Sequence, residues 1–253
     1  MMHSLDQDPE DAQNPPAGPR APAVTALSHV ATLAPFASLT REEARKLLDL
    51  ATVRRMDEQG AFFHEGDRAD HVYLVLEGYV RIQHVTPGGD QVVVVHVGPG
   101  QIFGISKVVE HDRYSASARA ASDTVALSWP GELWDQITRD YPSFVQETRR
   151  NVGLRLHELQ EKVVEMATRP VEQRIALAVL RLVDQAGHAT PEGVEVGFPI
   201  TRQDISDLTG TTMHSVSRYM SGWHKDGIVI SKRRRVVVCN PDNLRRVADG
   251  QAA

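Results

Sequence analysis

The sequence predicts an α+β fold in three parts: a small β-sandwich or roll, one long helix, and a C-terminal helix pair followed by a β-hairpin. Three patterns lead to this prediction. Short β-rich runs, each bounded by glycine or polar turns, follow one another over residues 60–129. Apolar residues then recur about every seven positions over residues 141–168. Two short helical stretches joined by Gly210 finally precede two strands.

Composition and charge narrow the classes of function. The 253 residues are 41% hydrophobic and 24% charged, which is ordinary for a soluble protein with room for two domains. The net charge of −5 is unevenly spread, because residues 201–250 hold nine Lys and Arg against five Asp and Glu. A basic end on an acidic chain favours binding of a polyanion by the C-terminal part.

The sequence also argues against a membrane protein and against some cysteine-based sites. No apolar run approaches the roughly 20 residues that span a bilayer, and the N-terminus lacks an apolar signal-peptide core. We therefore expect a cytoplasmic protein with no membrane partner. The single cysteine, Cys239, excludes an intramolecular disulfide and a four-cysteine iron–sulfur cluster.

The N-terminal half divides into a tail and a β-rich domain. Residues 1–24 carry five prolines among acids and small residues, so we expect a disordered tail. Residues 25–140 form the first domain, in which Thr40 caps a helix of sequence REEARKLLDLA. Short strands follow, and PGGD at residues 87–90 is a hairpin signal. Many short strands at regular intervals favour a sandwich or roll over βαβ units.

Residues 141–168 are predicted to form a dimerisation helix. Its apolar residues occupy coiled-coil a and d positions, interrupted only by Arg149. The predicted dimer contacts are Val145, Val152, Leu156, Leu159, Val163 and Met166. The alternative is a helix that packs only on its own roll.

Residues 169–250 are predicted to bind DNA. Thr201 caps one short helix, Thr212 caps the next, and Met213, Val216 and Met220 form the face that packs on the first helix. The opposite face stays free for the major groove, and the basic hairpin tip of residues 232–235 is placed to meet phosphate. The predicted DNA contacts are Thr201, Arg202, Thr212, His214, Ser215, Ser217, Arg218, Lys232, Arg233 and Arg234.

The chain resembles the CRP/FNR family of bacterial transcription regulators over about residues 33–247. The motifs that carry the resemblance are EGD at 65–67, LEGYVRI at 76–82, GPGQIFG at 98–104, ITRQDIS at 200–206 and SVSR at 215–218. The resemblance implies a cyclic-nucleotide-binding-like β-roll that senses a signal and a long helix that forms a homodimer. It also implies a winged helix-turn-helix that binds an inverted repeat, and a bound dimer that acts on RNA polymerase. His214 stands where the family usually has glutamate, whereas Arg218 matches the family's arginine and Ser217 matches the FNR branch.

The resemblance also bears on the signal. Of the residues that hold cyclic AMP, Gly104 and Ser115 match, but Ile105 and Tyr114 replace the glutamate and the arginine. A nucleotide would lose its phosphate and ribose partners at this expected effector pocket, so cyclic AMP is not expected. The more apolar pocket is similar to that of the nitric-oxide-responsive branch, some members of which bind haem. His96 and His111 are the candidate haem ligands.

Other readings stay open. Some family members bind no small molecule. A rival class is a ligand-binding module or enzyme whose C-terminal helices mediate protein contacts. The sequence shows no nucleophile–base pair, metal-ligand spacing or phosphate loop, so we expect no enzyme activity. The half-site sequence, the target operons and the choice between activation and repression are not predicted.

Overall fold

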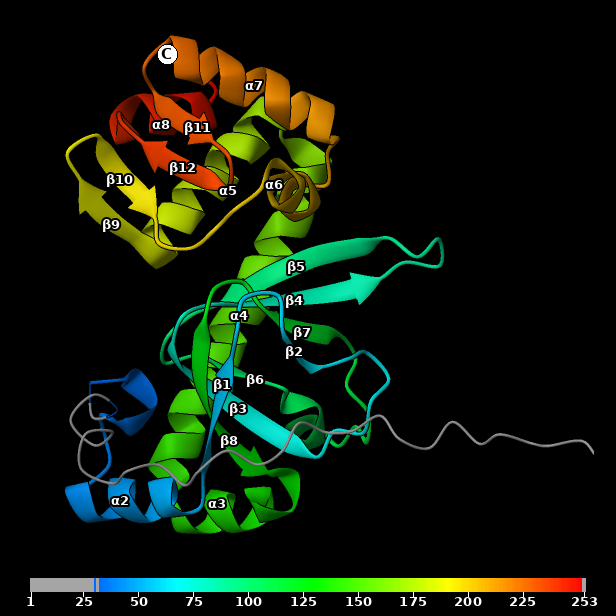
Figure 1. Cartoon of the computed structure of the whole chain (residues 1–253), viewed down its shortest axis with the longest axis vertical. Coiled ribbons are helices and arrows are strands. Elements are labelled where there is room, and N and C mark those ends of the chain that lie inside the picture. Colours follow the sequence, from blue (N-terminus) through cyan, green and yellow to red (C-terminus); the bar gives the residue numbers. More distant parts are fainter. Residues whose placement is uncertain (1–29, 31, 252–253) are drawn as a thin grey trace, which may run out of the picture.

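The computed structural model of the chain describes residue 30 and residues 32–251, so the tail expected at residues 1–24 lies outside the described residues. Two four-stranded antiparallel sheets form the N-terminal roll (Figure 1). One sheet has the order β1 (Thr52–Met56), β8 (Thr124–Pro130), β3 (His71–Glu77), β6 (Ile102–Phe103). The other has the order β2 (Ala61–Phe63), β7 (Ser117–Ala120), β4 (Val80–Val85), β5 (Gln91–Val97).

The roll has an apolar core on each side of the first sheet. Aromatic residues of β2, β3 and β6 fill the space between the sheets, among them Phe62, Tyr73 and Phe103. The outer face of the β3–β8 sheet packs against helices and buries Trp129 and Phe144. The covering helices are η1 (Ala34–Phe36), α2 (Arg41–Asp49), η2 (Ile105–Val109), η3 (Gly131–Leu133), α3 (Trp134–Asp140) and the start of α4 (Pro142–Thr168).

Two local sequence signals in the roll are confirmed. Thr40 and Glu43 form a capping box at the start of α2, where the Thr40 hydroxyl accepts from the Glu43 amide. The turn at residues 87–90 joins β4 to β5, with Gly89 at a φ of 87°. A positive φ at this place favours glycine because it has no Cβ.

The C-terminal domain is a winged helix-turn-helix. Its helices are α5 (Val171–Ala186), α6 (Arg202–Thr209), α7 (Met213–Lys225) and α8 (Pro241–Ala248). They pack on a sheet of order β11 (Val229–Lys232), β12 (Arg235–Val238), β10 (Gly193–Val196), β9 (Gly187–Thr190). The sequence patterns did not predict the β9–β10 hairpin. Its short strands hold few core residues, so they carry little apolar alternation.

The long helix α4 connects the two domains, and α5 begins directly after it (Figure 1). The fold class is therefore confirmed as a β-roll, a long helix and a winged helix-turn-helix. Within the part of the chain that the structure describes, no helix is long and apolar enough to cross a membrane.

Candidate nucleic-acid interface and domain contact

The helix pair α6–α7 is held by two caps and a glycine turn. The Thr201 hydroxyl and the Asp204 carboxylate form a capping box at the start of α6. Gly210 ends α6 in the left-handed conformation, with a φ of 57°. The Thr212 hydroxyl then accepts from the Ser215 amide at 3.1 Å and starts α7. These caps satisfy helix-end amides and fix where each helix begins.

One face of α7 anchors the helix in the domain core. Val216 and Met220 are fully buried, and Trp223 continues the stripe at helical spacing. Met213, expected on the same face, is 52% exposed, so that expectation was wrong. The core cluster that contains Val216 and Met220 does not include Met213.

The opposite face of α7 is open to solvent. Thr212, His214 and Arg218 are exposed, while Ser215 and Ser217 are half-buried. The Arg218 guanidinium lies 4.7 Å from the centre of the Tyr219 ring and donates to the Tyr219 hydroxyl at 3.0 Å. Sequence reasoning missed Tyr219, although an aromatic residue beside an arginine is a common stacking pair. The tyrosine holds the guanidinium in a defined place on the surface.

The hairpin β11–β12 forms the wing of the domain. Other predicted DNA contacts line a groove between this wing and α6. The groove has a volume of about 310 Å³, and its lining includes Thr201, Arg202, Lys232, Arg233 and Arg234. Lys232 and Arg233 are exposed cations, and Arg202 is half-buried. The helix start and the wing tip therefore form one basic surface next to α7.

Two cations of the wing are paired with carboxylates of the same chain. Arg235 makes ion pairs with Glu192 and Glu195, and these carboxylates raise the pKa of Arg235. Arg234, at the tip with a φ of 57°, pairs with Glu58 of the roll. In this arrangement Arg234 is held by Glu58 and is not free to bind phosphate, which corrects the expectation from the sequence. Its partner is far away in the sequence, which local patterns do not reveal.

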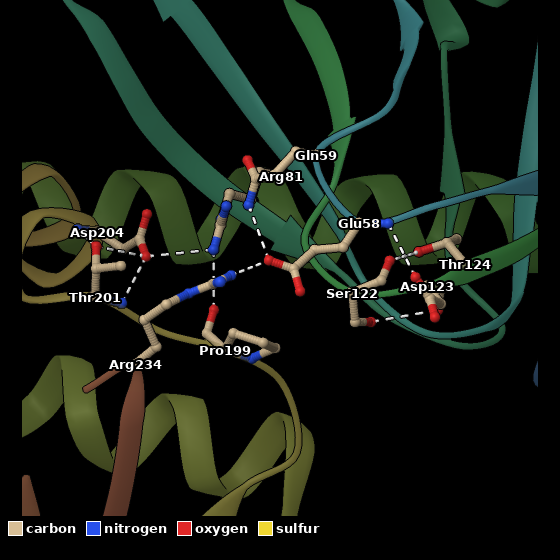
Figure 2. A network of polar contacts seen from close by, with 10 residues as sticks. All are labelled: Glu58, Gln59, Arg81, Ser122, Asp123, Thr124, Pro199, Thr201, Asp204 and Arg234. Carbon is tan, nitrogen blue, oxygen red and sulfur yellow. Dashed lines mark hydrogen bonds and ion pairs between the residues drawn. The ribbon is translucent and has the colours of Figure 1, made fainter. Parts of the chain in front are cut away.

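A polar network joins the roll to the start of α6 (Figure 2). Arg81 of β4 is 7% exposed, and its Nη2 donates to the Pro199 carbonyl at 2.9 Å. The same nitrogen lies 3.5 Å from the Asp204 carboxylate. Because Asp204 also caps α6, this buried ion pair connects the roll to the first helix of the DNA-binding unit. Nearby, the Asp207 carboxylate of α6 accepts from the Val93 amide of β5 at 3.1 Å.

The predicted dimer helix has an apolar stripe on its C-terminal half. Leu156, Val163 and Met166 are 57%, 62% and 45% exposed. Val152 and Leu159 are half-buried. Val145 is corrected as a dimer contact, because it is 2% exposed in the core of its own roll. The first turns of α4 cover the β3–β8 sheet, so an apolar residue there is used within the protomer.

Aromatic side chains pack against two residues of the expected effector pocket, Gly104 and Tyr114. The Tyr114 ring stacks on Phe63 with centroids 3.6 Å apart, and its hydroxyl donates to the His71 carbonyl at 2.7 Å. A Cβ at Gly104 would lie 2.9 Å from the Tyr73 ring. Ile105 is half-buried and Ser115 is exposed. The effector pocket at these four residues stays a prediction.

The two candidate haem ligands lie in different surroundings. His111 is exposed. His96 of β5 is 2% exposed, and neither ring nitrogen has a hydrogen-bond partner among the described residues. Burial, followed by the charges of Arg81 and Lys162, lowers the pKa of His96 to about 3. The imidazole is therefore neutral at physiological pH.

Comparisons with known proteins agree with this architecture. Residues 53–141 match the family model described as a cyclic nucleotide-binding domain, and residues 173–247 match the Crp-like helix-turn-helix domain. The chain is 28% identical to a cyclic AMP receptor protein of Thermus thermophilus, over 79% of this chain and 89% of the relative. It is 23% identical to a global nitrogen regulator of Synechocystis sp., over 82% and 92%.

A solved structure shows the same fold. A CRP-family transcriptional regulator of Thermus thermophilus superposes with a TM-score of 0.67 at 24% identity, covering 79% of this chain and 97% of that one. The roll, the long helix and the winged helix-turn-helix define the class of DNA-binding transcription regulators. The two matched models and the relatives support a DNA-binding transcription regulator of the CRP/FNR type.

Proposed function

We propose that the chain acts as a homodimer that binds an inverted-repeat DNA site through α7 and the wing, and that a signal other than cyclic AMP switches it. The observation that carries this proposal is that α7 has one face buried in the domain core and one polar face exposed to solvent. Val216 and Met220 fix the helix from beneath, while Arg218 and His214 stay on the surface. A rigid helix with an exposed polar face is what major-groove recognition requires.

The residues divide into base and phosphate contacts. Arg218 presents a planar fork that matches the O6 and N7 acceptors of guanine. Lys232 and Arg233 of the wing are exposed cations that suit the phosphates beside the groove. His214 replaces the family's usual glutamate, so we propose a half-site that differs from the family's commonest one.

The dimer is proposed from the apolar stripe on α4. Leu156 and Val163 are large exposed hydrophobic residues seven positions apart, as in a coiled coil. Two copies joined along this stripe would carry two copies of α7, which suits a two-fold symmetric site. The bound dimer would then act on RNA polymerase.

Cyclic AMP is disfavoured by the sequence and by the packing of Tyr114. Tyr114 occupies the position of the family's phosphate-binding arginine and is packed against Phe63. A second candidate is nitric oxide sensed through haem, which would supply an iron atom that binds the gas. The unpartnered ring nitrogens of His96 favour it over the exposed His111. A regulator that binds no small molecule is the remaining alternative.

Selection from a random duplex library tests the DNA-binding proposal. The full chain should enrich an inverted repeat, and its affinity for that repeat should fall steeply as salt rises, because bound phosphates release counterions. Failure to enrich any sequence would contradict it and would favour a module whose C-terminal helices bind protein. An absorption spectrum after haem addition, with and without nitric oxide, tests the second candidate signal.

A further inference from the structure

A cleft opens where the roll, α4 and α5 meet. Its volume is about 470 Å³, which falls in the range of roughly 300–1,000 Å³ typical of small-molecule sites. The cleft does not contain the four residues of the expected effector pocket. Side chains that matter for its chemistry are His96 from β5, Arg155, Glu158 and Lys162 from α4, and Arg181 from α5.

Two cations of the cleft lack an acidic partner. The Lys162 ammonium donates to the Val94 carbonyl and Arg155 donates to the Ile102 carbonyl, both at 3.2 Å. Neither makes an ion pair with a carboxylate within the described part of the chain. Burial lowers the pKa of each. Glu158 acts in the opposite direction on both cations, and Glu165 does so on Lys162, but burial is the larger effect. A half-buried cation that no carboxylate contacts costs free energy, so the site favours an anion.

Arg181 differs from these two cations. Both of its terminal nitrogens donate to Glu165, and this ion pair raises the pKa of Arg181. The acidic residues of the cleft, Glu158, Glu161 and Asp184, are exposed and therefore lie on its solvent side. The positive character is thus concentrated at Arg155 and Lys162.

His96 adds an uncharged polar group to the wall. It is buried without a hydrogen-bond partner among the described residues, and buried polar groups are normally satisfied. Its ring packs on Phe198, with centroids 4.7 Å apart. The charged groups that act on it are Arg81 and Lys162. A neutral imidazole offers one N–H donor and one acceptor to a ligand.

We propose that this cleft binds a small organic anion whose carboxylate or phosphate oxygens accept hydrogen bonds from Lys162 and Arg155 and whose polar remainder reaches His96. The role of the cleft as an effector site rests on the proposed function, whereas the binding of an anion to it does not. Because β5 belongs to the roll and α5 to the C-terminal domain, an occupant contacts both. It would stabilise the domain arrangement of Figure 1 and shift the population towards it.

Calorimetric titration of the full chain without DNA tests the proposal. Succinate serves as the carboxylate probe, glycerol 3-phosphate as the phosphate probe, and glycerol as the neutral control. At least one anion should bind with one site per chain, and glycerol should not. Lys162→Met should weaken that binding about tenfold or more, since it removes a charge-assisted hydrogen bond.

Matched variants locate the site. Arg150→Met removes an exposed cation of the same helix, and Arg233→Ala removes one from the predicted DNA surface, so neither should change the affinity. Should Lys162→Met fail to fold by circular dichroism, Lys162→Arg should retain binding and His96→Gln should weaken it.

Three results would overturn the proposal. The first is that neither anion binds. The second is that binding survives Lys162→Met or is lost in Arg233→Ala, which places the anion elsewhere. The third is a Soret band on haem addition that disappears in His96→Gln, which assigns the cleft to haem. All three leave the DNA-binding proposal standing, because library selection tests it independently.

Discussion

The guanidinium of Arg81 lies 3.5 Å from the carboxylate of Asp204, and the pair joins the N-terminal roll to the first helix of the helix-turn-helix. Both side chains are almost fully buried, at 8% and 9% exposed. Asp204 caps α6 at the same time. A change in the roll that moves β4 therefore acts directly on the start of the helix-turn-helix.

Arg81→Met should loosen this domain contact. The substitution leaves the buried Asp204 carboxylate without its cation, which costs about 3 kcal/mol by analogy with other broken buried pairs. Hydrogen exchange should then accelerate at the amides of α6. The double variant Arg81→Met with Asp204→Asn should recover much of the protection, because no uncompensated charge remains. Unchanged exchange in the single variant would show that the pair does not hold the domains together.

The link between Glu58 and Arg234 should weaken in acid. Hydrogen bonding to Arg234, followed by that to Gln59, lowers the pKa of Glu58 below its ordinary value. The contact is thus fully formed above the ordinary glutamate pKa and is lost as the pH falls through the lower folded value. Its contribution stays below about 1 kcal/mol, because both side chains are partly exposed to solvent.

The side-chain NMR signal of Arg234 reports on this contact. It should shift over that acidic range in the natural chain. In Glu58→Gln it should sit near its acid position at every pH. A signal in Glu58→Gln that still titrates in the same range would contradict the assignment of the pair.

Charge placed on the α4 stripe should separate the dimer. Leu156→Glu and Val163→Glu each put a carboxylate into the proposed seam, where burial without a partner is costly. Sedimentation at micromolar concentration should show monomers. His157→Glu, exposed on the same helix and outside the stripe, is the matched control and should stay dimeric. Dimers in all three variants would move the interface elsewhere.

Val145→Ala should behave differently from these variants. Val145 is buried in the roll, so its truncation should destabilise that domain by about 1–3 kcal/mol and leave the dimer intact. Thermal unfolding and sedimentation measured on the same sample would show both effects. Loss of the dimer without loss of stability would show that Val145 is a dimer contact, as the sequence predicted.

Local signals in the sequence were enough for much of the fold. The caps at Thr40, Thr201 and Thr212 and the turn at Gly210 depend on residues within one helical turn, and each lies where the pattern places it. The heptad pattern could not tell Val145 from Leu156, because both are apolar and only the tertiary fold decides which one the roll covers.

Long-range contacts were beyond the sequence patterns. Arg234 and Glu58 are 176 residues apart, and no local pattern connects a wing cation with a roll carboxylate. The stacking of Tyr114 on Phe63 likewise joins separate segments, which meet only in the folded roll. The β9–β10 hairpin was missed because its strands are short and mostly exposed or half-buried.

Fluorescence anisotropy with the selected inverted repeat and a scrambled duplex tests the central claim most directly. Arg218→Ala should reduce the preference for the repeat by about 1–3 kcal/mol, the worth of one bidentate base contact. Arg245→Ala removes an exposed cation from α8 and should keep the preference. An Arg218→Ala protein that still distinguishes the two duplexes as well as the natural chain does would show that α7 is not the reading helix.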